Sequence, residues 1–315
     1  MLTVLIKILG IFAIIVVGYI ATKTNIITKE SELSMVNLLI LITTPCMAFS
    51  SIVSKELDSS ISEKVILVLL VSLAYFIIMP ILVLPLGKIF THTPKEDIGV
   101  LMAIMVAANA GFMGFPITKA IFGDHFFFLI VVQNIILNIY LFGIAVLQMN
   151  YGSESKFDIK SIIKSVMNPC VVVSLIAMVI LFTGIKMPEP VMDITGMLGN
   201  VTTPLSMIIV GMRLANSKFD SVLKNRDLII ASLFNVLIAP VCAFLMVNWL
   251  PFLTDDVKLL IIWASAFPCA VIIAGLAAKE GRNATLVSEG IALTTLLSLI
   301  TLPIAATILT SLYLH

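Results

Sequence analysis

Apolar residues run along this chain in long stretches separated by short polar segments. A helix that crosses a membrane needs about 20 mostly apolar residues, and we assign ten stretches of that kind. The predicted spans are Leu2–Ile20, Ser34–Val53, Val65–Lys88, Ile98–Phe122, Phe126–Met149, Ile162–Gly184, Val191–Leu214, Leu228–Leu250, Val257–Ala278 and Leu286–Leu314. The pattern predicts an all-α membrane protein with ten transmembrane helices and no separate soluble domain.

Composition supports a lipid environment. The 315 residues are 60% hydrophobic and 12% charged, whereas soluble domains are roughly 45–50% apolar and about 25% charged. The net charge of +1 gives no reason to expect a nucleic-acid partner. The four cysteines lie in apolar runs without metal-like spacing, so we expect free thiols and neither a metal nor another cofactor.

The positions of Lys and Arg orient the helices. Thirteen of them lie in, or within three residues of, loops that follow odd-numbered helices, and four lie in, or within three residues of, loops that follow even-numbered helices. Cytoplasmic loops carry the excess of Lys and Arg. We therefore expect the odd loops to be cytoplasmic and both chain termini to lie outside the cytoplasm, with the plasma membrane as the location.

Two short motifs recur with a spacing of five helices. Thr43-Thr44-Pro45 in helix two matches Thr202-Thr203-Pro204 in helix seven, and Phe115-Pro116 in helix four matches Phe267-Pro268 in helix nine. Since five is odd, two halves of five spans would enter the membrane from opposite sides, as in the inverted repeats of secondary transporters. The predicted repeats are residues 1–149 and 162–315, joined by a cytoplasmic linker at 150–161. Coincidence is the alternative, because proline is common in membrane helices.

Helix four contains a group of helix-breaking residues at mid-membrane depth. Asn109, Gly111, Gly114 and Pro116 fall within eight residues, and Pro116 cannot complete the helical hydrogen-bond ladder. Broken backbone at that depth occurs where it is buried in protein or lines a wet cavity. Ser265 and Pro268 mark a milder break at the equivalent place in helix nine. The alternative is two packing kinks without a ligand.

Helix segments that start at Pro116 and Pro268 would present their N-termini near the middle of the bilayer, because proline suits the first position of a helix. Free N–H groups and the helix dipole favour an anion there. Asn134 and Asn138, four residues apart in helix five, share a face. Their amides would either bind a carboxylate or join neighbouring helices. Lys119 would either counter an anion or extend to the outer surface.

Several chemistries lack the residues they need. All 18 acidic residues lie in loops or near helix ends, whereas a proton antiporter that uses buried carboxylates needs one or two at depth. We find no nucleophile-elbow, zinc-protease, phosphate-loop or dinucleotide-binding motif. We therefore expect neither an enzyme nor an ATP-driven pump.

The stretch from Asn109 to Pro116, followed by Phe122-Gly123, resembles the fourth helix of the auxin efflux carrier family, and so do the Thr-Thr-Pro segments and the tail Leu293–Pro303. The resemblance covers essentially the whole chain. It implies two inverted five-helix repeats, a scaffold of helices one, two, six and seven, and a transport unit of helices three to five and eight to ten. It also implies that helices four and nine cross at their breaks and that dimers form through the scaffold.

The family includes plant auxin exporters and bacterial members described as malonate or malate permeases. This chain lacks the long hydrophilic central loop of the long plant exporters, so it resembles a short prokaryotic-type member. These features predict a secondary transporter of small organic anions, mono- or dicarboxylates, in the lipid bilayer as a homodimer. Three alternatives remain at this stage: a sodium- or proton-coupled carrier of another substrate, a non-transporting anion sensor, and an ion channel.

The predicted substrate site combines the polar and helix-breaking residues of helices four, five and nine. Its members are Asn109, Gly111, Gly114, Pro116, Asn134, Asn138, Ser265 and Pro268.

Overall fold

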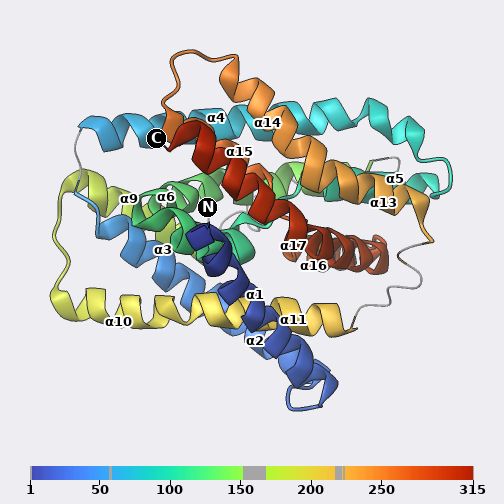
Figure 1. The fold of residues 1–315 in the computed structure, drawn as a ribbon, viewed down its shortest axis with the longest axis horizontal. Coiled ribbons are helices and arrows are strands. Elements are labelled where there is room, and N and C mark those ends of the chain that lie inside the picture. The colour runs from blue at the N-terminus through green and yellow to red at the C-terminus, as the bar shows by residue number, and fades with distance from the viewer. Residues whose placement is uncertain (1, 57–58, 152–167, 217–221, 223, 315) are drawn as a thin grey trace. The chain divides into compact units, whose positions relative to one another are not determined.

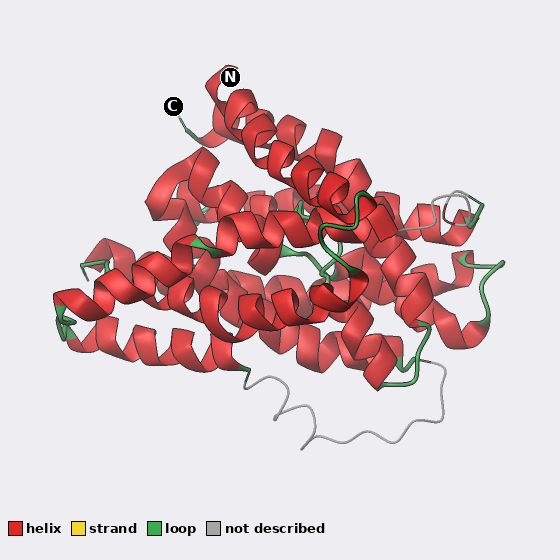
Figure 2. Cartoon of the chain, turned by 90° about the horizontal axis from the view of Figure 1, so that it is seen from below, coloured by secondary structure: helices red, strands yellow, loops and turns green. Residues whose placement is uncertain are grey.

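The protein is helical throughout the part of the chain that its structure describes. The computed structural model describes residues 2–56, 59–151, 168–216, 222 and 224–314. Within these ranges the backbone forms helices and loops (Figure 2). Extended pairing among the described residues is confined to one antiparallel bridge between Ala108 and Cys269. Most of the predicted linker at 150–161 and the first residues of the predicted sixth span lie outside the described residues.

Among the described residues, six helical stretches are long and apolar enough to cross a membrane. They are Glu30–Val53, Ile61–Ile89, Ala110–Met149, Glu189–Asn216, Arg226–Asn248 and Ala284–Tyr313. Leu9–Lys23 and Pro169–Thr183 are apolar but shorter. The chain is therefore a multi-pass all-α membrane protein, and the division into ten spans stays a prediction.

The chain forms two compact units, each built from several stretches of sequence. Unit 1 comprises Met1–Val68, Gly111–Ile135 and Met167–Asn216. Its helices are α1 (Leu2–Lys23), α2 (Lys29–Leu38), η1 (Leu39–Thr43), α3 (Thr44–Val53), α9 (Pro169–Thr183), α10 (Glu189–Asn200) and α11 (Thr202–Asn216), with most of η3 (Ala110–Gly114) and of α6 (Phe115–Ile139).

Inside unit 1, α1 packs along α11, and α3 packs against both α9 and α10. In Figure 1, α10 and α11 follow one another almost in line and α1 crosses α11. Glycines allow this close approach. A Cβ atom at Gly18 would overlap the carbonyl oxygen of Ile208, and one at Gly211 would overlap the carbonyl oxygen of Ile15. Small residues at such contacts let membrane helices approach closely.

Unit 2 comprises Leu69–Ala110, Ile136–Val166 and Ser217–His315. Its helices are most of α4 (Ser59–Val83), η2 (Pro85–Ile89), α5 (Lys95–Val106), η4 (Tyr140–Ile144), α7 (Ala145–Met149), α13 (Arg226–Leu233), η5 (Phe234–Ile238), α14 (Ala239–Asn248), α15 (Asp255–Ser265), α16 (Ile272–Lys279) and α17 (Ala284–Tyr313). The long helix α17 contacts α5, α13, α15 and α16, and α5 and α15 are buried along most of their lengths.

The units differ from the scaffold and transport unit that the family resemblance implies, most of all within helices four and five. Unit 1 contains the predicted helices one, two, six and seven, and it also contains Gly111–Ile135 from helices four and five. The division therefore falls inside helix four, directly after Ala110, where the helix is broken. A break interrupts the ladder of backbone hydrogen bonds that holds a helix together as one rigid rod, so the segments before and after it can belong to different units.

Gly123 separates the predicted fourth and fifth helices. Its φ of 80° and ψ of −170° interrupt α6, and glycine adopts positive φ without the steric cost that a Cβ atom imposes. The helix four segment therefore ends at Phe122, as predicted, and helix five continues through η4 and α7 to Met149. The Thr-Thr-Pro motifs lie at the starts of α3 and α11.

Candidate functional site

Two helices of unit 2 are interrupted, and their interrupted segments pair with each other. Helix α5 ends at Val106 and continues as extended backbone, while α15 ends at Ser265 and α16 begins only at Ile272. The N–H of Asn109 donates to the carbonyl of Pro268 at 2.7 Å, and the N–H of Ala270 donates to the carbonyl of Ala107 at 2.9 Å. These bonds form the antiparallel bridge centred on Ala108 and Cys269.

Local sequence explains where helix nine stops. Pro268 has no N–H and clashes with a preceding helical turn, and its ring disfavours helical backbone at Phe267. The Phe267 ring is fully buried against Trp263, with ring centroids 4.9 Å apart. Unpaired backbone groups at membrane depth cost several kcal/mol each by transfer arguments, roughly 2–7 kcal/mol. The two breaks lower that cost by pairing with each other.

Thr294 on α17 completes the second break. Its hydroxyl accepts the N–H of Cys269 at 3.1 Å and donates to the carbonyl of Gly290 at 2.8 Å. Thr294 is fully buried. The sequence prediction did not include it in the site. The sequence does contain an indication of this role. Thr294, Thr295 and Ser298 place three hydroxyls inside an otherwise apolar helix, and a buried hydroxyl needs a hydrogen-bond partner.

The side chain of Asn109 lies at the first of the two breaks. Asn109 is 4% exposed, and its carboxamide forms no hydrogen bond with a described residue. A polar side chain at a broken membrane helix is a candidate ligand-binding group.

Comparison with known proteins identifies the family of this chain. Residues 3–306 match the family model described as "Membrane transport protein". The chain belongs to the auxin efflux carrier family. An uncharacterized transporter of Methanocaldococcus jannaschii is 24% identical over 302 residues, covering 93% of this chain and 94% of the relative. Another, from Methanothermobacter thermautotrophicus, is 25% identical over 309 residues, covering 96% and 97%. This membrane transport family is not a family of enzymes.

The helix starts of this family member differ from those predicted at Pro116 and Pro268. The first half-helix begins at Ala110 with the π-helical turn η3, and the second begins at Ile272. The glycines of η3 tolerate the wide turn, so helical backbone starts before Pro116. Pro268 lies in the extended bridge, where its carbonyl accepts a hydrogen bond. The positive end of the first half-helix therefore directly follows Asn109.

The structure places the remaining predicted residues in two groups. Ser265 ends α15 beside the bridge, and its hydroxyl donates to the carbonyl of Ile262 at 2.7 Å. In unit 1, Asn134 lies against Gly111, with its Oδ1 atom 3.3 Å from the place of a Cβ at residue 111. The other predicted members are buried Gly114 and Pro116 in unit 1 and half-buried Asn138 in unit 2.

Unit 1 of the transporter also contains a polar cavity of about 410 Å³. Helices α3, α6 and α10 line it, and its charged residues are Lys55, Lys119 and Asp124. Lys119 lies 3.7 Å from Asp124 and over the ring of Phe127, at 5.3 Å from its centroid. The two lysines and one aspartate give the lining a net positive charge. Serines 50, 51 and 54 and Asn200 add uncharged hydrogen-bonding groups.

Proposed function

We propose that this protein is a secondary transporter that moves small organic anions, mono- or dicarboxylates, across the plasma membrane by alternating access. The observation that carries the proposal is the carboxamide of Asn109, which lies beside two paired helix breaks and forms no hydrogen bond with a described residue. Discontinuous helices near the bilayer midplane form the substrate sites of many secondary transporters. The amide would donate to the substrate carboxylate.

The start of a half-helix at Ala110 favours an anion over a cation. The first N–H groups of a helix have no partner within it, and the helix dipole adds the equivalent of roughly half a positive charge at that end. Asn109 directly precedes this helix start. A carboxylate bound there would accept hydrogen bonds from the amide and from the helix N-terminus together. The proposed site also includes Gly111, Gly114, Pro116, Asn134, Asn138, Ser265 and Pro268.

The positive cavity of unit 1 independently supports an anionic substrate. A concave surface lined by charge of one sign raises the local concentration of the opposite ion. Lys55 and Lys119 outweigh Asp124 in this cavity, so it would attract a carboxylate and repel a small cation.

The proposed architecture consists of two inverted repeats, residues 1–149 and 162–315, joined by the cytoplasmic linker 150–161. The antiparallel pairing of one break from each half supports this proposal, and so does the position of both Thr-Thr-Pro motifs at helix starts. A homodimer and chain termini outside the cytoplasm complete it, on the grounds of the family resemblance and of the excess of Lys and Arg in odd-numbered loops.

Binding is the first experiment. Purified protein is melted with malonate, malate, succinate, lactate and indole-3-acetate, each tested with wild type and with Asn109→Ala. A ligand at a hundred times its Kd stabilises the native state by about 2.7 kcal/mol, which raises the melting temperature of the wild type. We expect at least one carboxylate to stabilise the wild type and to lose most of that effect in the variant. No shift with any acid would contradict an anionic substrate.

Transport is then measured by counterflow of the stabilising acid in liposomes. Exchange of labelled for unlabelled acid would support a carrier, whereas binding without exchange would indicate a sensor. Currents far above carrier turnover would indicate a channel. Uptake that depends on a sodium or proton gradient would identify a coupled carrier.

A further inference from the structure

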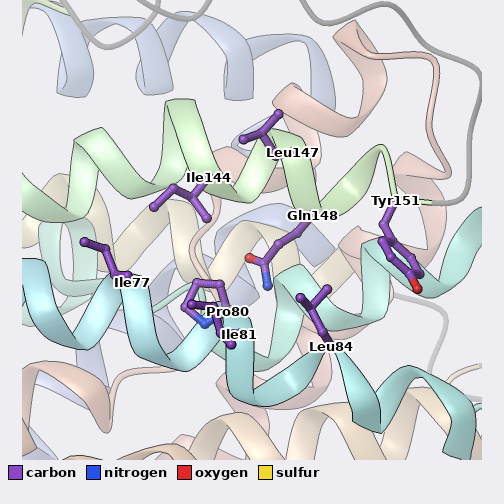
Figure 3. Close-up of a pocket in the computed structure, with 8 residues that line it drawn as sticks. All are labelled: Ile77, Pro80, Ile81, Leu84, Ile144, Leu147, Gln148 and Tyr151. Carbon is purple, nitrogen blue, oxygen red and sulfur yellow. The ribbon is translucent and has the colours of Figure 1, made fainter.

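A groove on unit 2 lies between α4 and the end of helix five. It has a volume of about 300 Å³. Its lining is almost entirely apolar, with Gln148 as the one amide (Figure 3). The residues that line it are Ile77, Pro80, Ile81, Leu84, Ile144, Leu147, Gln148 and Tyr151. In Figure 3 the amide of Gln148 points from its own helix toward the helix that carries Pro80 and Ile81.

The amide of Gln148 has one satisfied atom and one unsatisfied atom. Its Oε1 accepts a hydrogen bond from the hydroxyl of Tyr140 at 2.8 Å, whereas its Nε2 is buried and has no partner among the described residues. The residue is 5% exposed. Since a glutamine amide nitrogen carries two N–H donors and cannot accept, an occupant of the groove must bring an acceptor oxygen.

Packing fixes the direction of this donor. The Tyr140 ring stacks on Phe76, with centroids 4.8 Å apart, so the hydroxyl that holds Oε1 has little freedom. The backbone of Gln148 lies against Gly99 of α5, where a Cβ atom would overlap the Gln148 carbonyl oxygen. With Oε1 and the backbone both held, Nε2 remains directed into the groove.

The rim of the groove is suited to hydrocarbon. Ile77, Ile81, Leu84 and Leu147 are each about 40–60% exposed, which in a membrane protein is contact with lipid rather than with water. Pro80 completes the apolar floor.

The groove also lies near the ends of its helices. Leu84 is followed within five residues by the end of η2 at Ile89, and Gln148 precedes the last residue of α7, Met149. At about 1.5 Å per helical residue, the donor lies within a few ångströms of a helix end, the level at which lipid acyl chains join their headgroups. Exposed Tyr151, beside the donor, is a residue type enriched at that interface.

We propose that this groove binds one acyl chain of a glycerophospholipid, and that the ester carbonyl of the chain accepts a hydrogen bond from Nε2 of Gln148. The hydrocarbon fills the apolar part of the groove, and the ester carbonyl supplies the acceptor at interfacial depth. Exposed Lys88, one turn beyond Leu84 in the chain, carries a positive charge toward the same end and suits the lipid phosphate. The bound lipid would connect α4 to the end of helix five.

The test compares wild type, Gln148→Leu and Tyr140→Phe in mild detergent. After delipidation, each protein is titrated with a diacyl phosphatidylglycerol and with its diether analogue, which lacks the ester carbonyl. Native mass spectrometry counts bound lipid, and a thermal melt reports stabilisation. Tyr140→Phe keeps the Nε2 donor but removes the hydroxyl that holds Oε1, so it tests whether this hydrogen bond directs the donor into the groove. Ile81→Trp fills the groove without changing Gln148.

We expect the ester lipid to bind the wild type about three- to tenfold more tightly than the ether lipid, the effect of one hydrogen bond. The preference should weaken in Tyr140→Phe, where Oε1 is no longer held, and vanish in Gln148→Leu, and Ile81→Trp should bind one lipid fewer. Equal binding of both lipids to the wild type, or an unchanged lipid count in Ile81→Trp, would overturn the proposal. Dissociation of a dimer by Ile81→Trp, with no change in the amount of bound lipid, would also overturn it, because a second copy of the chain would then cover the groove.

Discussion

The backbone N–H of Asn109 donates to the carbonyl oxygen of Pro268 across 2.7 Å. This bond joins two helix interruptions that are far apart in the sequence. The Asn109 side chain forms no hydrogen bond with a described residue. The backbone of Asn109 therefore pairs the two breaks, and its side-chain amide is available to a ligand. Its two roles can be separated by substitutions that change only the side chain.

Asn109→Ala should weaken carboxylate binding while the break stays formed. A hydrogen bond to a charged group contributes about 1.5–3 kcal/mol, so we expect Kd to rise about 10- to 100-fold. Calorimetric titration with the acid that stabilises the wild type measures this change. Asn37→Ala, at an exposed position of α2, is the control and should bind normally. Unchanged affinity in Asn109→Ala would remove Asn109 from the site.

Lys55→Gln should slow uptake at low substrate concentration and low ionic strength. The positive cavity attracts anions through charges that salt screens with a Debye length of about 8 Å at 0.15 M. We expect a two- to tenfold lower initial rate at low salt, which converges with the wild type at high salt. The double variant Lys119→Gln/Asp124→Asn removes an ion pair but keeps the net charge, so its salt dependence should stay close to that of the wild type. Equal salt dependence in all three proteins would argue against attraction by this cavity.

Thr294→Val should loosen the second break, because it leaves the buried N–H of Cys269 without its acceptor. The expected loss of stability is about 1–3 kcal/mol. The buried thiol of Cys269 gives a local readout: maleimide should label it faster in Thr294→Val, in a background with the other three cysteines replaced by serine. Thr294→Ser keeps the hydroxyl and should label slowly. Equal labelling of both variants would mean that the hydroxyl does not hold the break.

Gly211→Ala should destabilise unit 1, because the added Cβ overlaps the backbone of α1. Overpacking of this kind typically costs about 1–3 kcal/mol, so the melting temperature should fall. Gly10→Ala is the matched control in the same helix pair, because nothing lies within 4 Å of a Cβ there. It should leave the melting temperature the same or slightly higher, since alanine favours helix by about 1 kcal/mol over glycine. A similar fall of the melting temperature in both variants would mean that overlap at the α1–α11 contact does not cause the loss of stability.

Some site features were predictable because they depend on local chemistry. The interruption near Pro268 follows from a missing N–H and a steric clash, and the turn at Gly123 follows from the conformational freedom of glycine. Other features depend on distant partners. Helical backbone begins at Ala110 and not at Pro116, and Thr294 caps Cys269 from another helix.

The sequence by itself determined that the protein lies in a lipid bilayer, that it is all-α, to which family it belongs, and near which residues two helices break. Each of these follows from residue composition, from the length of apolar runs, or from residues close together in the chain. Only the tertiary structure decided that the two breaks pair through Asn109 and Pro268, that Thr294 completes the pairing, and that Gln148 directs an unsatisfied donor into an apolar groove. The physical reason is that each of these features depends on groups from different helices. Packing between the helices sets the distances between such groups, and the order of residues in one helix does not specify that packing.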